Sequence, residues 1–417
     1  MRQLLVKVDG NVVVMTLEDL IADVMTPATR ALVKTIATHA LVKTSDESKD
    51  LNDYYAKEMM TGQDINISFA KACWLTINRA CNLRCEWCYA KETEFQSDDN
   101  MSLEMIEGLV NMCYNNNVLY YILIGGEPTI HPAFFEIINL LAKKGCKTTI
   151  VTNGLKLANK SFCEKLSVYK DNLRISISLK GSSDDYYQAH CGAAVFTQVC
   201  QAITNCKDNN LAFSLSYVIS ADNVASIDVF AKEIKASGIT DFIGFSFCNE
   251  VIQRSGGFDE VYKEQNSPIQ VNAILNEKYE ALNSILDGNF SIHQSLPLCL
   301  CDKNILSKMK SRNHISTSCH VHNREGIIFD TNGEILLCNH FVGYGIGKYG
   351  VDYYDADSLL KFWNSPNMIR FHQMLTSMPS KECVNCNLSE NCGGGCCIQW
   401  FTHSFENYLS EYKKINP

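Results

Sequence analysis

Strand-like apolar runs alternate with helical patterns along the middle of the chain. From about residue 73, short runs rich in β-branched and aromatic residues precede segments in which apolar positions recur at helical spacing. Strands that alternate with helices form a parallel sheet with right-handed crossovers. We therefore predict six parallel strands, at 73–78, 119–124, 147–152, 174–179, 211–219 and 241–247, and helices at 102–116, 133–144, 161–169, 195–206 and 226–237.

The two ends of the chain follow other patterns. At the start, two strand-like runs joined by Asp9-Gly10 predict a hairpin, which a helical pattern at 28–42 follows. After about residue 290 the alternation stops, and cysteine, glycine and short strand-like runs take over. The sequence thus predicts three units: a small N-terminal α+β unit at 1–70, an α/β core at 71–290 and a metal-organised unit at 291–417.

The length of the chain and its net charge exclude some classes of function. The 417 residues exceed one compact domain, at about 150 residues per domain. A net charge of −9 argues against nonspecific nucleic-acid binding, which needs clustered Lys and Arg. No apolar run reaches the roughly 18 residues of a transmembrane helix, and Lys7, Asp9 and Gly10 interrupt the opening run, so it does not fit a signal peptide. We expect a cytoplasmic protein that binds neither nucleic acid nor membrane.

The cysteine content is the most unusual feature of the composition. The first group of cysteines along the sequence is the most informative one. The chain has twenty cysteines, and Cys81, Cys85 and Cys88 follow the first predicted strand of the core. Closely spaced thiolates on a loop can hold an iron–sulfur cluster, and three ligands leave one of four irons open. A structural zinc site needs a fourth ligand, and no His or Cys follows within the next twenty residues.

The spacing of these cysteines, with Trp87 before the third, resembles the CxxxCxφC signature of the radical S-adenosylmethionine (SAM) family. The second predicted strand ends in Gly125, Gly126, Glu127 and Pro128, similar to the family's GGEP motif. The resemblance implies that Cys81, Cys85 and Cys88 hold a catalytic [4Fe–4S] cluster and that Glu127 and the two glycines bind the methionine ammonium group. It also implies a partial (β/α)6 TIM-like barrel over residues 73–290.

Further SAM contacts are expected at the ends of later strands. The resemblance places Asn153 near the nucleoside and assigns Ser176, Ser178 and Lys180 to the methionine carboxylate and ribose; Tyr89 is a further expected contact. Many relatives have Asp where Lys180 stands, so this lysine is either a carboxylate contact or a solvated residue at a strand end. His190 and Cys191, which follow, are expected to be structural.

A second cysteine array lies in the C-terminal unit. Its intervals resemble the SPASM domain of radical enzymes that modify peptides, which carries auxiliary four-iron clusters. The resemblance groups Cys319, Cys338 and Cys396 with Cys299, or with Cys301 as the alternative. It assigns the second cluster to Cys383, Cys386 and Cys392, with an open iron or with Cys397, Cys301 or a non-cysteine fourth ligand. A zinc ribbon formed by Cys383, Cys386, Cys392 and Cys396 is the competing interpretation.

The two arrays together imply an enzyme that modifies a peptide. The expected reaction is cleavage of SAM to a 5′-deoxyadenosyl radical, which abstracts hydrogen from a ribosomally made precursor peptide and leads to a thioether or C–C cross-link. A flavodoxin- or ferredoxin-type reductant is the expected electron donor. The N-terminal unit either binds a leader peptide by strand addition or is a structural cap. The alternatives are oxidation of a protein Ser or Cys, as in anaerobic sulfatase maturation, and a non-catalytic iron–sulfur electron-transfer protein.

Overall fold

A ten-stranded sheet forms the centre of the computed structural model, in the order β12-β11-β8-β7-β6-β5-β4-β3-β13-β14. All neighbours in it are parallel except β13 and β14. The structure describes residues 3–8, 11–16, 69–90, 99–249, 251–252, 258–259, 267–343, 345–365, 368–369, 372, 379–402 and 404–416.

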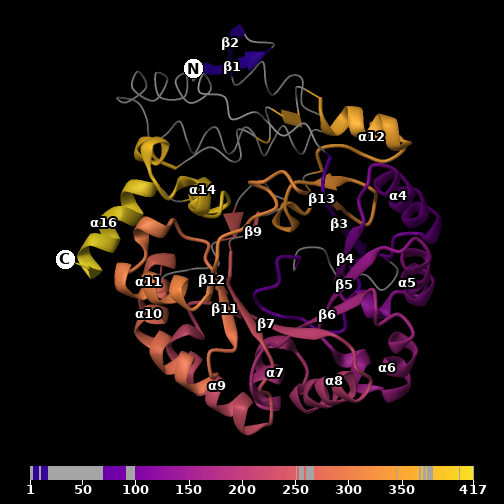
Figure 1. Cartoon of the computed structure of the whole chain (residues 1–417), viewed down its shortest axis with the longest axis horizontal. Helices are drawn as coiled ribbons and strands as arrows, with labels where there is room; N and C mark the ends of the chain where they lie inside the picture. The colour runs from indigo at the N-terminus through magenta and orange to yellow at the C-terminus, as the bar shows by residue number, and fades with distance from the viewer. Residues whose placement is uncertain are drawn as a thin grey trace.

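The six predicted strands of the core are confirmed, and they lie side by side in sequence order. Helices follow the strands and surround the curved sheet on its outside (Figure 1). The strands are β3 (Ala72–Asn78), β4 (Tyr120–Gly125), β5 (Lys147–Thr152), β6 (Leu173–Ser178), β7 (Phe213–Ile219) and β8 (Ile243–Phe247). The predicted helices are α4 (Leu103–Asn115), α5 (Phe134–Lys143), α6 (Lys160–Ser167), α8 (Phe196–Asp208) and α9 (Ile227–Ala236).

The expectation that alternation stops near residue 290 is wrong. Helix α10 (Pro268–Ile285) leads to β11 (Phe290–His293), which pairs in parallel with β8, and α11 (Lys303–Ser311) leads to β12 (Ile315–Ser316). Strands of four and two residues are too short to show a period of two, so the sequence pattern did not reveal them. Helix α7 (Asp184–Cys191) was not predicted either.

The sheet also extends on its other side, across the predicted unit boundary at residue 290. Strand β13 (Gly326–Phe329) pairs in parallel with β3, and β14 (Ile335–Leu336) closes that edge. The remaining C-terminal helices are α12 (Ala356–Trp363), α14 (Ser389–Cys392), α15 (Gln399–Thr402) and α16 (Phe405–Ile415). Residues from both predicted units therefore share one sheet, and the division at 290 stays a prediction.

The N-terminal hairpin is confirmed in part. Strands β1 (Gln3–Val8) and β2 (Asn11–Thr16) pair antiparallel, with Val8 opposite Asn11 across the Asp9-Gly10 turn. Two short strands, β9 (Val251–Ile252) and β10 (Phe258–Asp259), form another antiparallel pair. The helical pattern predicted at 28–42 lies outside the described residues.

The two faces of the sheet differ in chemistry. One face contributes large apolar side chains, such as Leu75 and Ile175, to the hydrophobic core that it forms with the helices. On the opposite face, the strands from β6 to β8 present small polar side chains that are only partly buried. These include Ser176, Ser178, Ser214, Ser216 and Ser246. The inner face of this half of the sheet is therefore polar and accessible.

A buried ion pair connects the residues that follow β3 and β13, near the carboxyl ends of these two neighbouring strands. Arg79, which follows β3, donates to Asp330, which follows β13, from Nε at 3.0 Å and from Nη2 at 2.5 Å. The two side chains are only 2% and 9% exposed. Removing one partner of a buried pair leaves an uncompensated charge, whereas replacing both with apolar residues is often tolerated.

We therefore expect Asp330→Leu alone to destabilise the protein by about 3–5 kcal/mol. The double variant Arg79→Met/Asp330→Leu should lose less stability than either single variant. Urea unfolding followed by circular dichroism measures both effects. This account of the pair would be contradicted if the single variant and the unsubstituted protein had equal urea midpoints. It would also be contradicted if the losses of stability were additive in the double variant.

Candidate metal centre and cofactor site

The three-cysteine loop begins directly after β3, at the carboxyl edge of the parallel sheet, and Cys81, Cys85 and Cys88 are all partly buried. The backbone N–H of Arg84 donates to Cys191 O at 2.8 Å, and that of Glu86 donates to His190 O at 3.1 Å. These bonds attach the loop to the C-terminal end of α7. The carboxyl edge is where parallel α/β sheets carry their chemistry.

The three thiols have different electrostatic surroundings. Burial raises the pKa of Cys81 to about 11 and also raises the pKa of Cys88. A hydrogen bond with the Cys191 thiol lowers the pKa of Cys85 to about 6, and the Lys180 ammonium group acts in the same direction. The charge of Lys180 also acts on Cys88. The lysine therefore lies close to the cysteine loop, as expected for a residue at the cofactor site.

The Gly-Gly-Glu segment after β4 packs directly on the stem of this loop. The backbone N–H of Gly126 donates to Asn78 O at 2.9 Å, and that of Glu127 donates to Ala80 O at 2.8 Å. A Cβ atom on Gly126 would lie 2.2 Å from Ala80 O, and one on Gly125 would lie 2.3 Å from Asn78 O. Backbone atoms cannot move aside as a flexible side chain can, so both positions require glycine.

Glu127 connects the ends of β4 and β5. Its carboxylate accepts hydrogen bonds from the Thr129 and Thr152 hydroxyls, at 2.5 and 2.6 Å, and from the backbone N–H of Asn153 at 2.7 Å. The side chain is 1% exposed, and burial raises its pKa. Oε2 accepts only the Asn153 bond among the described residues, which leaves acceptor capacity on that oxygen. Ammonium binding by Glu127 stays a prediction.

The other expected cofactor residues fall into two places. The Asn153 amide donates to Asn82 Oδ1 in the cysteine loop at 2.7 Å, and Ser176 and Ser178 lie on β6, on the inner face. Tyr89 instead contacts Arg79, and its ring lies 5.6 Å from that of His340 in the C-terminal unit. Burial raises the pKa of Tyr89 to about 12. Contact of these residues with SAM stays a prediction.

Sequence reasoning did not place three residues at the loop, although it named one of them, Cys191, as structural. Arg79 and Asp330 pair across two strand ends, and Cys191 contacts Cys85 at the end of a helix that was not predicted. For the ion pair, the available signal was one charged residue, Arg79, directly after the predicted strand at 73–78. The sequence holds no comparable signal for Cys191, because its partner lies more than a hundred residues away.

The C-terminal cysteines form two groups. The first, called the Cys338 group, contains Cys319, Cys338 and Cys396, which pack against the main hydrophobic core and act electrostatically on one another. Cys397 lies with them, because its thiol shares a hydrogen bond with that of Cys396 and interacts with Cys319 and Cys338. Burial raises the pKa of Cys338 to about 12. The second, called the Cys386 group, contains Cys383, Cys386 and Cys392. Both sets contain the members that the sequence predicted.

The structure places Cys299 differently from the prediction. Its electrostatic neighbours are Cys392, Cys383 and Cys386, and none of its resolved interactions involves the Cys338 group. The reason is the path of the chain: the backbone N–H of Leu298 donates to Cys392 Sγ at 3.2 Å, which holds residue 299 beside the Cys386 group. Cys299 precedes Cys319 in the sequence, but this order did not predict that the two residues lie close together.

The zinc-ribbon interpretation requires Cys383, Cys386, Cys392 and Cys396 to meet, but Cys396 lies with Cys319 and Cys338 instead. Within the described residues, no three His, Cys, Asp or Glu side chains are arranged to hold a single metal ion. The cysteines in this part of the chain form no disulfides. Thiolates are soft ligands, and sets of thiolates that surround a centre larger than a single metal ion fit an iron–sulfur cluster.

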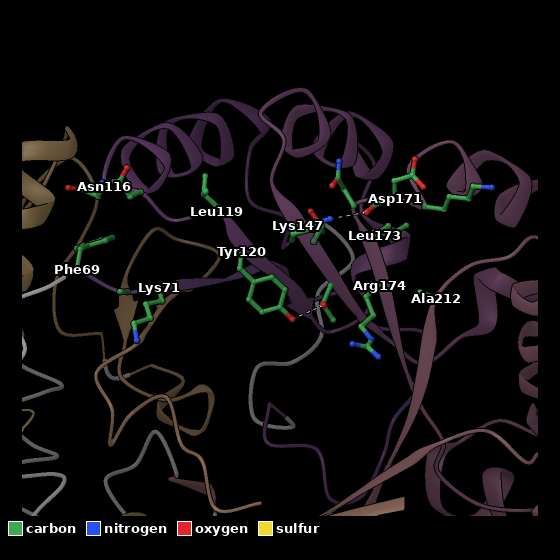
Figure 2. A pocket seen from close by; sticks show the side chains of 16 residues that line it. Phe69, Lys71, Asn116, Leu119, Tyr120, Lys147, Asp171, Leu173, Arg174 and Ala212 are labelled. Carbon is green, nitrogen blue, oxygen red and sulfur yellow. Dashed lines mark hydrogen bonds between the residues drawn. The ribbon is translucent and has the colours of Figure 1, made fainter. Parts of the chain in front are cut away.

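A cavity of about 980 Å³ lies at the opposite edge of the sheet. Figure 2 shows its lining residues, which include Tyr120, Lys147 and Arg174 at the amino-terminal ends of β4, β5 and β6. The Tyr120 hydroxyl forms a 2.8 Å hydrogen bond with Thr149 there. Because the cysteine loop follows the carboxyl end of β3, this cavity is separate from the candidate metal centre.

Comparison with protein families identifies the core. Residues 75–234, which run from β3 into α9, match the model of the radical SAM superfamily. The chain contains a radical SAM domain. This superfamily uses a [4Fe–4S] cluster and SAM, which agrees with three soft thiolate donors at the carboxyl edge of the sheet.

Two curated relatives resemble part of this chain. AlbA of Bacillus subtilis, an antilisterial bacteriocin subtilosin biosynthesis protein, is 28% identical over 40% of this chain and 37% of its own length. The mycofactocin maturase MftC of Mycobacterium ulcerans is 26% identical over 39% of this chain and 43% of its own. The chain thus aligns with less than half the length of these two relatives.

Solved structures extend the likeness of the fold. SuiB of Streptococcus suis, bound to the precursor peptide SuiA, matches with a TM-score of 0.58 and 18% identity, over 93% of this chain and 91% of SuiB. The enzyme anSMEcpe with bound AdoMet and the Kp18Cys peptide matches with a TM-score of 0.61 and 18% identity, over 82% and 95%. At this identity, the likeness supports the radical SAM fold alone.

The effect of Lys180 on the candidate site can be tested without the cofactors. In metal-free protein, Lys180→Ala should raise the pKa of Cys85, because a neighbouring cation no longer stabilises its thiolate. We expect alkylation of Cys85 by iodoacetamide at pH 7 to slow several-fold, as measured by peptide mass mapping. Lys170→Ala, in the opposite-edge cavity, is the matched control and should leave the rate unchanged. An unaltered rate in Lys180→Ala would show that the ammonium group does not act on the thiolate.

Proposed function

We propose that this protein is a radical SAM peptide maturase that acts on a ribosomally made precursor peptide and forms a thioether or C–C cross-link. The observation that carries the proposal is the cysteine loop, held by backbone hydrogen bonds against the Gly-Gly-Glu segment at the carboxyl edge of the sheet. The similarity to AlbA and to the maturase MftC supports a peptide substrate.

The residues present fit the two cofactors. Cys81, Cys85 and Cys88 would hold the [4Fe–4S] cluster, and three thiolates leave one iron for SAM. When bound, the cluster supplies the electron that cleaves SAM to the radical that abstracts a substrate hydrogen. Lys180 supplies a cation next to the loop that would pair with the methionine carboxylate, and Glu127 Oε2 retains capacity to accept from the ammonium group.

The inner face of the sheet supports a peptide as substrate. Serines on β6, β7 and β8 are partly exposed there and can exchange hydrogen bonds with a peptide backbone. In the C-terminal unit, which we assign to the SPASM type, the Cys338 and Cys386 groups would hold auxiliary clusters that accept the electron released when the cross-link forms. The N-terminal unit is proposed to bind the leader peptide.

The proposed partners are the precursor peptide and a flavodoxin- or ferredoxin-type reductant. Within the described residues, no helix is long and apolar enough to cross a membrane. We propose a cytoplasmic location, where such reductants and newly made peptides are present. Oxidation of a protein Ser or Cys, of the sulfatase-maturing type, is the competing activity, because anSMEcpe shares the fold.

The central test is formation of 5′-deoxyadenosine. Anaerobically reconstituted and reduced protein should convert SAM to methionine and 5′-deoxyadenosine, quantified by liquid chromatography and mass spectrometry. The variant Cys81→Ala/Cys85→Ala/Cys88→Ala should lose this activity to background, because no thiolate remains to hold the cluster, while iron bound to the C-terminal cysteines persists.

Cys146→Ala is the matched control, because Cys146 is a fully buried core residue away from the loop, and it should retain activity. Cleavage that persists in the triple variant would refute the assignment of the site. The mass of a candidate precursor peptide after co-expression then separates cross-linking from oxidation of a single Ser or Cys.

A further inference from the structure

The turn between Cys392 and Cys396 determines how the C-terminal cysteines divide. Gly393, Gly394 and Gly395 all have positive φ angles, of 58°, 74° and 81°. Only glycine adopts positive φ angles at low energetic cost, so a run of three such residues requires three glycines. The run reverses the direction of the chain. A Cβ atom on Gly395 would lie 2.8 Å from Ser295 O, so the turn also packs on the segment before Cys299. Cys392 and Cys396 therefore face different groups although only three residues separate them.

Cys299 and Cys301 lie on the same short segment and both have Cys392 as an electrostatic neighbour, but they differ in burial. Cys301 is buried in a small apolar cluster with Leu298 and Leu306, and its thiol donates to Pro297 O at 3.8 Å. Cys299 is exposed, and the neighbouring Leu298 N–H bonds directly to Cys392 Sγ. The backbone N–H of Cys396 donates to Ser295 O at 2.7 Å, which fixes this segment beside the glycine turn.

From this geometry we propose that Cys299 is the fourth thiolate of the Cys386 group, which becomes a closed four-cysteine set with Cys383, Cys386 and Cys392. The inference rests on the proposed function, since it assumes that the C-terminal unit holds auxiliary clusters. It differs from the arrangement that the sequence predicted, in which Cys299 joins Cys319, Cys338 and Cys396, and the second cluster has an open iron or takes Cys397, Cys301 or a non-cysteine ligand.

The Cys338 group does not need Cys299, because a fourth cysteine already lies with it. Cys397, beside Cys396, is 4% exposed; its thiol shares a hydrogen bond with the Cys396 thiol and interacts electrostatically with Cys319 and Cys338. With Cys299 counted in the Cys386 group, each of the two groups therefore contains four cysteines.

The Cys338 group is the one that lies near the core strands. His320, next to Cys319, stacks on Trp74 of β3 with ring centroids 4.3 Å apart. His340, two residues after Cys338, lies beside Tyr89, the neighbour of Cys88. The Cys338 group thus adjoins the proposed site of radical formation, and Cys299 belongs to the other group.

The test uses the full-length protein carrying Cys81→Ala/Cys85→Ala/Cys88→Ala, so that all bound iron belongs to the C-terminal cysteines. Iron and sulfide content and the electron paramagnetic resonance (EPR) spectrum of the reduced protein are recorded. We expect two clusters with separate signals, of which one is lost with Cys338→Ala and the other with Cys386→Ala.

In the same background, Cys299→Ala should alter the same EPR signal as Cys386→Ala, and the neighbouring control Cys301→Ala should alter neither signal. Cys299→Ser covers a loss of folding in the alanine variant, because a serine oxygen can still bind iron and would shift that signal without loss of iron. An effect of Cys299 on the signal that depends on Cys338, or an effect of Cys301 alone, would overturn the ligand assignment.

The outcomes separate this inference from the proposed function. Protein that holds no iron at the C-terminal cysteines would refute the auxiliary clusters and the assignment of Cys299 together, whereas 5′-deoxyadenosine formation by the unsubstituted protein would still support the radical SAM activity. Two clusters whose signals are both unchanged by Cys299→Ala would refute the assignment of Cys299 alone.

Discussion

The contact between the Gly-Gly-Glu segment and the stem of the cysteine loop is the constraint on which the site depends. Two backbone hydrogen bonds join residues 126 and 127 to residues 78 and 80, at a separation that leaves no room for a Cβ atom on Gly126. Glu127 then reaches across to the end of β5. The ends of three neighbouring strands thus form one hydrogen-bonded unit that fixes where the loop of Cys81 begins.

The other side of β3 connects the same loop to the C-terminal unit. Strand β13 pairs with β3, and the buried pair of Arg79 and Asp330 joins the residues that follow the two strands. Tyr89 lies between Arg79 and His340, so it contacts residues of both units. The shared sheet therefore connects β13 and β14, which precede Cys338, to the strand that the cysteine loop follows.

Much of this arrangement could be predicted from the sequence, because periodicity and motif spacing are local. The six core strands and the loop of Cys81, Cys85 and Cys88 follow from patterns within a few residues. Strands β11 and β12 escaped prediction because they are too short to show a period. The partners of Cys299 and Arg79 escaped it because they depend on how distant segments pack, which no local pattern records.

The most direct test of the central claim, that three thiolates at this sheet edge hold a cluster with one iron open to SAM, is electron–nuclear double resonance of the reduced protein. SAM labelled with isotopes in its amino nitrogen and carboxylate oxygen should show hyperfine coupling to the cluster, and the variant without Cys81, Cys85 and Cys88 should show none. Bound SAM without coupling to either label would contradict the account.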